Sequence, residues 1–335
     1  MKSSAIAHSN IALIKYWGRS REHDPNLNIP LNDTVSMTKY GLTDGIHLQT
    51  HTTIELSPDY DKDIVTVEGQ EITGRHLERI IRVIDHLRAL ANIDYPFKMV
   101  SQNDFPTQAG LASSASAFAA LAIAAANALG LKFSREDLSK IARLGSGSAA
   151  RSIHGGFVYC HKGSSHETSF AEQICTRDCF DMNAVIAIVD MGKKEITSDE
   201  GHNLAHTSPF NHIRIQKSQQ QAKKIKKLIL ENDFNAVGQM AEANCLYMHS
   251  VMMTSQPSLF YWQSATLNII KTIQKLRIEG LPCYFTIDAG PNVHCLCQSK
   301  NMHELQKLIE QIDGVEKTIL VRPADDAYVT KEHLF

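Results

Sequence analysis

The sequence predicts an α+β protein of two domains. Its 335 residues are enough for about two domains of ordinary size. Segments typical of strands and of helices follow one another in an irregular order, not in the regular alternation that builds a parallel sheet. Hydrophobic residues make up 43% of the chain and charged residues 21%, which is enough apolar material for packed cores. Because no repeat or long linker divides the chain, we expect two closely joined domains, 1–181 and 182–335.

The first half begins with strands and continues with helices. Runs of β-branched or alternating residues predict strands at 52–57, 64–68 and 97–101. Helices are predicted at 74–91, 113–129 and 134–144, the last with Ser134 and Asp137 in a near capping box. Strands are then predicted at 155–161 and 184–190, and the continuous apolar run of the second requires both faces of that strand to be buried.

The second half is dominated by helices. Three successive helices are predicted at 211–231, 233–250 and 259–280. Two strands, a helix and a final strand follow at 283–287, 293–298, 302–312 and 318–322.

Charge and targeting signals exclude several classes of protein. The chain has 34 Lys and Arg against 36 Asp and Glu, so a dominant nucleic-acid surface is not expected. No stretch reaches the ~18 apolar residues of a membrane span, and the start of the chain lacks a signal-peptide core before Lys15. We therefore expect a cytoplasmic protein whose seven cysteines are reduced thiols, with no zinc-site spacing among them.

A segment of small residues joins a predicted strand to the alanine-rich helix. It reads P-T-Q-A-G-L-A-S-S-A-S from Pro106 to Ser116. Small residues allow close approach to a ligand, and the N-terminus of the helix attracts phosphate. Ser113 and Ser114 add hydroxyl groups suited to phosphate or Mg²⁺. The alternative is a capped helix entry with small residues for packing, and the standard P-loop motif is absent.

A second turn of small residues spans 145–152 and reads G-S-G-S-A-A-R-S. It matches a dinucleotide-binding pattern, but a predicted helix precedes it where that pattern requires a strand. The hydroxyls of Ser146 and Ser148 and the guanidinium of Arg151 suit an oxyanion. The alternative is a glycine-rich turn with a surface arginine.

Two further segments bring charged groups to the ends of apolar runs. Lys15, Tyr16 and Arg19 follow the apolar run that starts at Asn10. They indicate either an anion-binding site or an edge strand whose cations reach the solvent. Asp288 follows a buried strand beside Gly290 and Pro291. It is either a turn-forming residue or a positioned base.

Together these segments resemble the GHMP kinase superfamily, and within it the diphosphomevalonate decarboxylase family. The N-I-A-L-I-K-Y-W-G-R opening, the phosphate loop, the G-S-G-S-A-A-R-S turn and the D-A-G-P-N strand end occur in family order. The resemblance implies an N-terminal domain like the second domain of ribosomal protein S5, which binds ATP, and a ferredoxin-like C-terminal domain that carries the catalytic aspartate. It implies an active site between them and a homodimer.

The resemblance also implies roles for individual residues. Asp288, Lys15 and Arg151 are the expected catalytic residues, and Arg151 also lies near the substrate carboxylate. ATP and Mg²⁺ are the expected co-substrate and cofactor, with the metal nearest Ser113 or Ser114. The expected substrate-binding residues are Tyr16, Arg19, Ser146, Ser148, Arg151 and Ser198. The expected ATP-binding residues are Pro106, Ala109, Gly110, Leu111, Ala112, Ser113, Ser114 and Ala115.

The implied activity is ATP-dependent decarboxylation of mevalonate 5-diphosphate to isopentenyl diphosphate. The alternatives are a decarboxylase of the monophosphate, a mevalonate 3-kinase that stops after phosphorylation, and a module that binds without turnover. Two departures from the family pattern bear on the choice: Arg19 replaces a lysine, and Asp199 stands where some members carry a cation for the distal phosphate.

Overall fold

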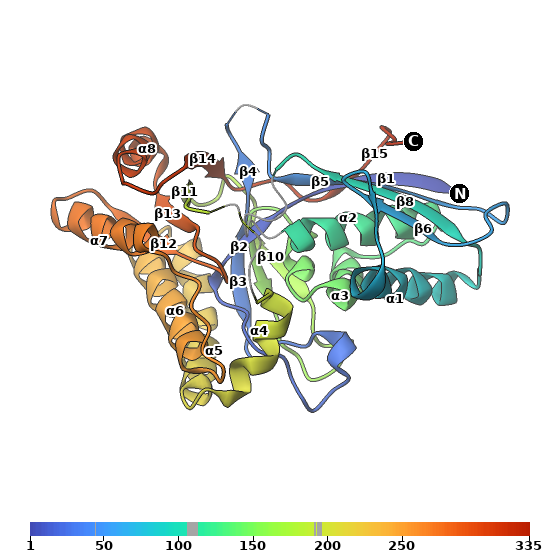
Figure 1. Ribbon diagram of the computed structural model, residues 1–335, viewed down its shortest axis with the longest axis horizontal. Helices are drawn as coiled ribbons and strands as arrows, with labels where there is room; N and C mark the ends of the chain where they lie inside the picture. The colour runs from blue at the N-terminus through green and yellow to red at the C-terminus, as the bar shows by residue number, and fades with distance from the viewer. Residues whose placement is uncertain (44, 106–112, 191, 193–195) are drawn as a thin grey trace.

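The computed structural model describes residues 1–43, 45–105, 113–190, 192 and 196–335. It confirms the predicted α+β class. Two lobes lie side by side along the long axis, with strands β2, β3 and β10 between them (Figure 1). Both ends of the chain lie on the lobe formed by the first half.

The first lobe is a six-stranded sheet with helices packed against one face (Figure 1). Its strands, in spatial order, are β15 (Tyr328–Thr330), β1 (Lys2–His8), β5 (Gln49–Leu56), β8 (Phe97–Asn103), β6 (Ile64–Val67) and β7 (Gln70–Glu71). Its helices are α1 (Gly74–Ala91), α2 (Ser113–Ala128) and α3 (Arg135–Gly145). The small alanine side chains of α2 let that helix pack closely on β1 and β5, and they are almost all buried.

A four-stranded sheet connects the lobes. Its order is β10 (Ala171–Cys175), β9 (Phe157–Cys160), β3 (Thr34–Thr38) and β2 (Asn10–Ile14), with the short helices η1 (Pro25–Leu27) and η2 (Ala149–Ser152) nearby in the chain. Ile11, Val35 and Phe157 of this sheet share one apolar core with Ile186 and Ile225 of the second lobe. This shared core explains why no flexible linker is needed.

The second lobe is an antiparallel five-stranded sheet with helices. Its order is β12 (Cys283–Thr286), β13 (Val293–Cys297), β11 (Asn183–Ile188), β14 (Lys317–Arg322) and β4 (Tyr40–Gly41). Its helices are α4 (Ser198–Leu204), η3 (Ala205–Thr207), α5 (Asn211–Leu230), α6 (Phe234–Thr254), α7 (Ser264–Ile278), η4 (Ser299–Asn301) and α8 (Met302–Glu310). Apart from β4, the chain runs strand, helices, two strands, helix, strand, which is the ferredoxin-like arrangement.

Most of the predicted elements lie where the sequence indicated. Helix α1 has the predicted bounds, and the Ser134 side chain accepts a bond from the Asp137 N–H at 3.1 Å, as a cap should. Helix α7 begins at Ser264, five residues after the predicted start. Strand β1 was not predicted, because its small and polar residues are buried nearly throughout and show no alternation.

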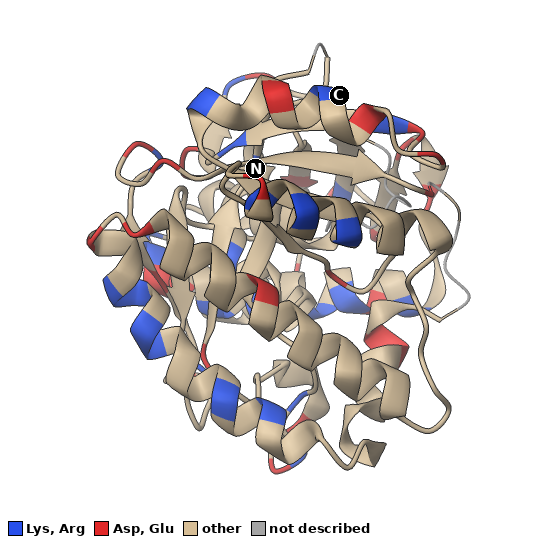
Figure 2. Ribbon diagram, turned by 90° about the vertical axis from the view of Figure 1, so that its left-hand side faces the viewer, with Lys and Arg blue, Asp and Glu red and all other residues tan. Residues whose placement is uncertain are grey.

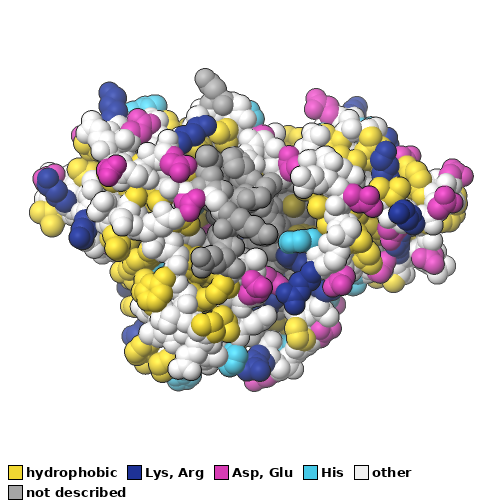
Figure 3. Space-filling model, viewed as in Figure 1, with side chains coloured by type: hydrophobic (Ala, Val, Ile, Leu, Met, Phe, Trp, Pro, Cys, Tyr) yellow, Lys and Arg dark blue, Asp and Glu magenta, His cyan; other side chains and the backbone are white. Residues whose placement is uncertain are grey.

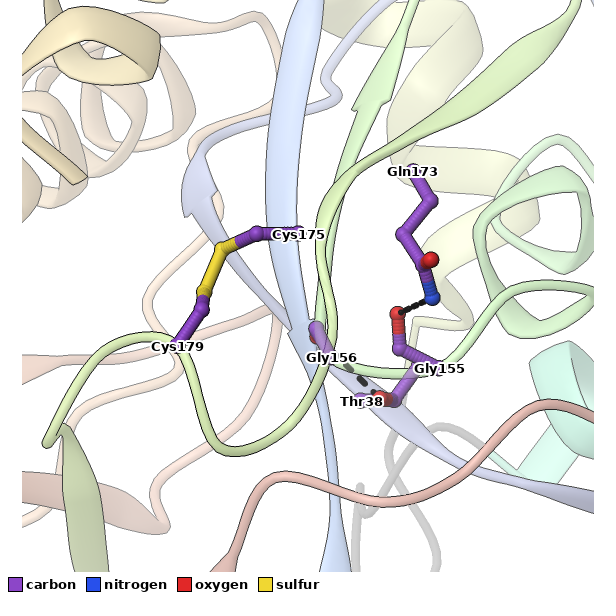
Figure 4. The surroundings of a disulfide bond; sticks show 6 residues. All are labelled: Thr38, Gly155, Gly156, Gln173, Cys175 and Cys179. Atoms are coloured by element: carbon purple, nitrogen blue, oxygen red, sulfur yellow. Dashed lines mark hydrogen bonds between the residues drawn. A yellow bond between two sulfur atoms is a disulfide. The ribbon is translucent and has the colours of Figure 1, made fainter. Parts of the chain in front are cut away.

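The expectation that all seven cysteines are reduced is wrong for two of them. Cys175 and Cys179 form a disulfide, shown in Figure 4, and their Cα atoms are 6.1 Å apart. They lie at the end of β10 and in the following turn, which brings the two side chains together. The other five cysteines are free and buried.

The surface has no dominant charge. Figure 2 shows basic and acidic residues mixed over the helices of the second lobe, in line with the formal net charge of −2. Among the described helices, none is long and apolar enough to span a membrane.

Candidate active site

A cavity of about 540 Å³ opens between the two lobes. Figure 3 shows this face hollowed near its centre, with basic side chains and a histidine at the edge of the hollow. Lys15 and Ala115 are buried behind the cavity wall. The predicted residues that line it are Tyr16, Arg19, Ser113, Ser114, Ser146, Ser148, Arg151, Ser198 and Asp288.

Lys15 and Asp288 meet at the inner wall of the cavity. Lys15 follows β2 and Asp288 lies just beyond β12, and the Lys15 Nζ donates to Asp288 Oδ1 at 2.6 Å. The Lys15 backbone N–H donates to Asn244 Oδ1 at 2.8 Å, which fixes the start of the lysine side chain. The Lys15 side chain is 1% exposed and that of Asp288 33% exposed, so the carboxylate faces the cavity and the ammonium lies behind it.

The surroundings of Asp288 favour its ionised form. Burial acts to raise the pKa of this carboxyl, but the cations Lys15, Lys39 and Arg151 lower it below its ordinary value. The turn after β12 is closed by a backbone bond from the Gly290 N–H to the Asp288 carbonyl. Because the backbone closes the turn, the side chain is available as a positioned, ionised acceptor.

The turn over 145–152 carries a row of hydroxyls along the cavity. The Oγ atoms of Ser146 and Ser148 are 3.1 Å apart, and that of Ser114 lies 3.4 Å from Ser146. A side chain at Gly147 would lie 2.3 Å from the Tyr16 hydroxyl, so the Tyr16 ring requires glycine here. Helix α3 precedes the turn and the short helix η2 follows it. This context excludes the strand–turn–helix arrangement of a dinucleotide-binding motif.

Arg151 is a buried cation, not the surface arginine of the alternative interpretation. It is 3% exposed, and its Nη1 donates to Thr34 Oγ1 at 3.3 Å. Its guanidinium lies 5.9 Å from the centre of the Tyr16 ring. The Nε atom is buried and has no hydrogen-bond partner among the described residues. A buried guanidinium with unused donors is suited to an anionic ligand in the cavity.

Arg19 and Asp199 form an ion pair on the cavity wall. The Arg19 Nη2 donates to Asp199 Oδ1. Burial opposes ionisation of this carboxyl, but the Arg19 guanidinium holds the pKa of Asp199 below its ordinary value. Asp199 and Ser198 belong to the first turn of α4, which begins with a capping box between Thr197 and Glu200. The acidic residue that departs from the family pattern therefore faces the site.

The predicted ATP-binding segment is only partly described. Pro106, Ala109, Gly110, Leu111 and Ala112 lie outside the described residues. Ser113 and Ser114 open helix α2 and line the cavity, where the positive end of the helix favours an anion. Ala115 is fully buried in the first turns of α2.

Four arginine and histidine residues of the wall were not among the predicted site residues. Arg75, His76 and Arg79 come from α1, and His202 comes from α4. The spacing of Arg75 and Arg79 places them on one face of a helix, but many solvated helices show the same spacing. His202 had no signal in the sequence beyond its proximity to Ser198.

Comparisons with family models and with known proteins all match this chain to decarboxylases of phosphorylated mevalonate. Residues 7–171 match the family model of the diphosphomevalonate decarboxylase-like N-terminal domain, and residues 184–330 match that of the mevalonate 5-diphosphate decarboxylase C-terminal domain. A phosphomevalonate decarboxylase of Haloferax volcanii is 33% identical, over 95% of each chain. A diphosphomevalonate decarboxylase of Candida albicans is 33% identical, over 92% of this chain and 87% of its own.

Solved structures agree over nearly the whole length. The mevalonate diphosphate decarboxylase from Staphylococcus aureus has a TM-score of 0.90 and 36% identity, over 98% of both chains. A structure of MDDEF in complex with MVAPP, AMPPCP and magnesium has a TM-score of 0.89 and 35% identity, over 99% of both chains.

Proposed function

This chain belongs to the diphosphomevalonate decarboxylase family, and on that premise we propose that it decarboxylates mevalonate 5-diphosphate at the expense of ATP. The products are isopentenyl diphosphate, ADP, phosphate and CO₂. The observation that carries the proposal is an ionised carboxylate, Asp288, which faces the cavity and is backed by the buried ammonium of Lys15. Division of the chain at residues 181 and 182 is part of the proposal. It is supported by family models that end at residue 171 and begin at residue 184.

The mevalonate part of the substrate binds along the serine turn. Ser146 and Ser148 offer hydroxyls, and Arg151 offers unused donors to the substrate carboxylate. Tyr16, Arg19 and Ser198 hold the phosphate end. A rigid, buried set of donors orients the substrate before the chemical step, which lowers the entropic cost of that step.

ATP binds with its phosphates at the start of α2. Ser113 and Ser114 present hydroxyl oxygens there, a ligand type that Mg²⁺ accepts together with phosphate oxygens. A similar structure, that of MDDEF, is in complex with MVAPP, AMPPCP and magnesium, which supports ATP and Mg²⁺ as ligands of this chain. When bound, Mg²⁺ would neutralise part of the negative charge on the phosphates.

Asp288 acts on the tertiary 3-hydroxyl of the substrate. Hydroxide is a poor leaving group, so the γ-phosphoryl group is first transferred to the 3-oxygen, which becomes a phosphate ester. The cations around Asp288 make it a weak base, and we infer that it accepts a hydrogen bond from the hydroxyl and aims its oxygen at the γ-phosphorus. A loose phosphoryl-transfer transition state requires this orientation before the proton moves. As the bond from the 3-oxygen to the γ-phosphorus forms and the bond to ADP breaks, the oxygen becomes more acidic and its proton passes to the Asp288 carboxylate.

The second step breaks two bonds of the phosphorylated intermediate. Phosphate departs with the C3–O bonding pair, and the electrons of the bond to the carboxylate form the new double bond as CO₂ leaves. Lys15 and Arg151 favour the phosphate as a leaving group by stabilising negative charge near C3. Arg151 also keeps the carboxylate in place until the phosphate has left.

One experiment separates the candidate activities. The pure protein is incubated with ATP and with mevalonate, its 5-phosphate or its 5-diphosphate, each carrying ¹⁴C in the carboxylate. Release of ADP and ¹⁴CO₂ with the diphosphate is the expected result. ADP release without CO₂ would identify a 3-kinase, and preference for the 5-phosphate would indicate the activity named for the Haloferax relative. No ATP turnover with any of the three substrates would indicate a binding module.

The homodimer and the cytoplasmic location belong to this proposal as well. The family resemblance of the sequence supports the homodimer. Sedimentation of the purified protein tests the first, and fractionation of cells tests the second.

A further inference from the structure

His202 is held rigidly at the cavity wall. It lies on α4, and the preceding residue, Gly201, presses the helix against Trp17: a side chain at Gly201 would lie 2.6 Å from the indole ring. The His202 ring centre is 4.7 Å from the centre of the Trp17 ring and 4.5 Å from that of Tyr16. The ring is therefore fixed in position by two aromatic neighbours while it lines the cavity.

One hydrogen bond fixes the position of the proton on this ring. The Gly18 backbone N–H donates to the Nδ1 atom of His202 at 2.9 Å. An Nδ1 that accepts a bond carries no proton, so a neutral ring has its proton on Nε2, at the other edge of the imidazole. Protonation of Nδ1 would place two N–H groups against each other.

The charges around His202 favour the same neutral form. Burial is the main cause that holds the pKa of His202 well below its ordinary value. The cations Arg19, Arg214 and Arg151 act in the same direction, and Asp199 opposes them. The ring is thus a neutral donor across the physiological pH range.

We propose that His202 is a specificity-determining residue that donates its Nε2–H to a phosphate oxygen of the phosphorylated substrate. This inference rests on the proposed function. Asp199 and His202 are one turn apart on α4, so the ring lies on the same face as the residue that pairs with Arg19. Among the described residues, the hydrogen bond that orients this ring is made at Nδ1, which leaves Nε2–H for the ligand. A neutral donor contributes a directed bond without adding another cation next to Arg19.

Two substitutions distinguish the effect of the Nε2–H donor from the effect of the aromatic ring. His202→Phe keeps an aromatic ring between Tyr16 and Trp17 and removes the donor, whereas His202→Gln keeps an N–H donor. For His202→Phe we expect the KM for mevalonate 5-diphosphate to rise roughly 10- to 100-fold, which is the usual range for a lost bond to a charged group. The KM for ATP should change less than twofold, and His202→Gln should recover part of the loss. His206→Phe, at an exposed histidine outside the cavity, is the matched control.

An NMR measurement on the unaltered protein keeps the test independent of folding and of turnover. The ¹⁵N shifts of His202 should identify the Nε2–H form, and the Nε2 resonance should shift when mevalonate 5-diphosphate is added without ATP. A His202→Phe protein with an unaltered KM, or an Nε2 resonance that does not respond to the ligand, would overturn the inference. Failure of the proposed function would be recognised separately, because the unaltered protein would then release no CO₂.

Discussion

The ammonium of Lys15 lies 2.6 Å from a carboxylate oxygen of Asp288, although the two residues are 273 positions apart in the chain. The pair joins the end of a strand in the central sheet to the end of a strand in the second lobe. This ion pair of the active site therefore forms only when both parts of the protein are folded together.

Asp288→Asn should abolish turnover while the protein stays folded. The amide oxygen can still accept the Lys15 bond, but the negative charge that orients the hydroxyl is lost. We expect kcat to fall roughly a thousand-fold or more, with ATP binding retained. Activity, melting temperature and nucleotide binding are measured on the same sample.

Asp288→Ala provides the contrast, because it leaves a buried ammonium without this partner. It should lower both stability and activity, and a further Lys15→Met change should restore stability only. If loss of activity in Asp288→Asn merely followed a loss of folded protein, the carboxylate would have a structural role alone.

Arg151→Lys should weaken binding of the mevalonate substrate and not of ATP. A lysine cannot reproduce the planar, two-donor grip of a guanidinium on a carboxylate. We expect the KM for the mevalonate substrate to rise by about one to two orders of magnitude, measured at saturating ATP. Wild-type kcat and KM would mean that Arg151 only supports Thr34 and the ring of Tyr16.

The ion pair between Arg19 and Asp199 allows us to predict how variants at these positions respond to the number of phosphates in the substrate. If the diphosphate is the substrate, Arg19 holds its phosphate end despite the nearby carboxylate. Arg19→Ala should then lower kcat/KM about a hundred-fold, and Asp199→Asn should change it less than tenfold. A large gain for the diphosphate in Asp199→Asn, from a weak starting activity, would instead identify the monophosphate as the natural substrate.

Lys39 should make the stability of the protein depend on pH above neutrality. This side chain is fully buried, its Nζ is 3.2 Å from the Nε2 of His294, and burial lowers the pKa of Lys39 to about 7. Between pH 7 and 10.5 Lys39 binds a proton in the unfolded chain but not in the folded chain, so its contribution to the free energy of unfolding rises with pH.

Lys39→Met removes this contribution. The variant should be more stable than the wild type near pH 7, by about 4 kcal/mol at most, and this difference should shrink as the pH rises to 10. Urea unfolding at several pH values measures both. A difference in stability between the variant and the wild type that does not shrink as the pH rises from 7 to 10 would contradict the assignment.

Local sequence signals predicted the parts of the fold that depend on neighbouring residues. The apolar period of α1 and the serine cap of α3 require only a few adjacent positions, and both are found in the structure. Four motifs in family order also identified most of the cavity wall, since backbone turns and helix starts place those side chains locally.

Long-range packing decided what the sequence could not predict. Helix α4 has seven residues, too few for a periodic signal, and Trp17 holds it in place. Lys39 directly follows strand β3, which was not predicted, and nothing local indicates that its ammonium is buried beside His294. The pairing of Arg19 with Asp199 likewise depends on where two distant segments meet.

The exchange of edge strands between the lobes constrains how the chain can be synthesised. Strand β4, from the first half, completes the second-lobe sheet, and β15, which follows the second-lobe strands in the chain, covers the outer edge of β1. During translation, β1 leaves the ribosome more than 300 residues before its partner β15, so this edge of the sheet stays unpaired while all the residues between them are made. A nascent chain that stops before Tyr328 would leave that edge of β1 open to pairing with strands of other unfinished chains.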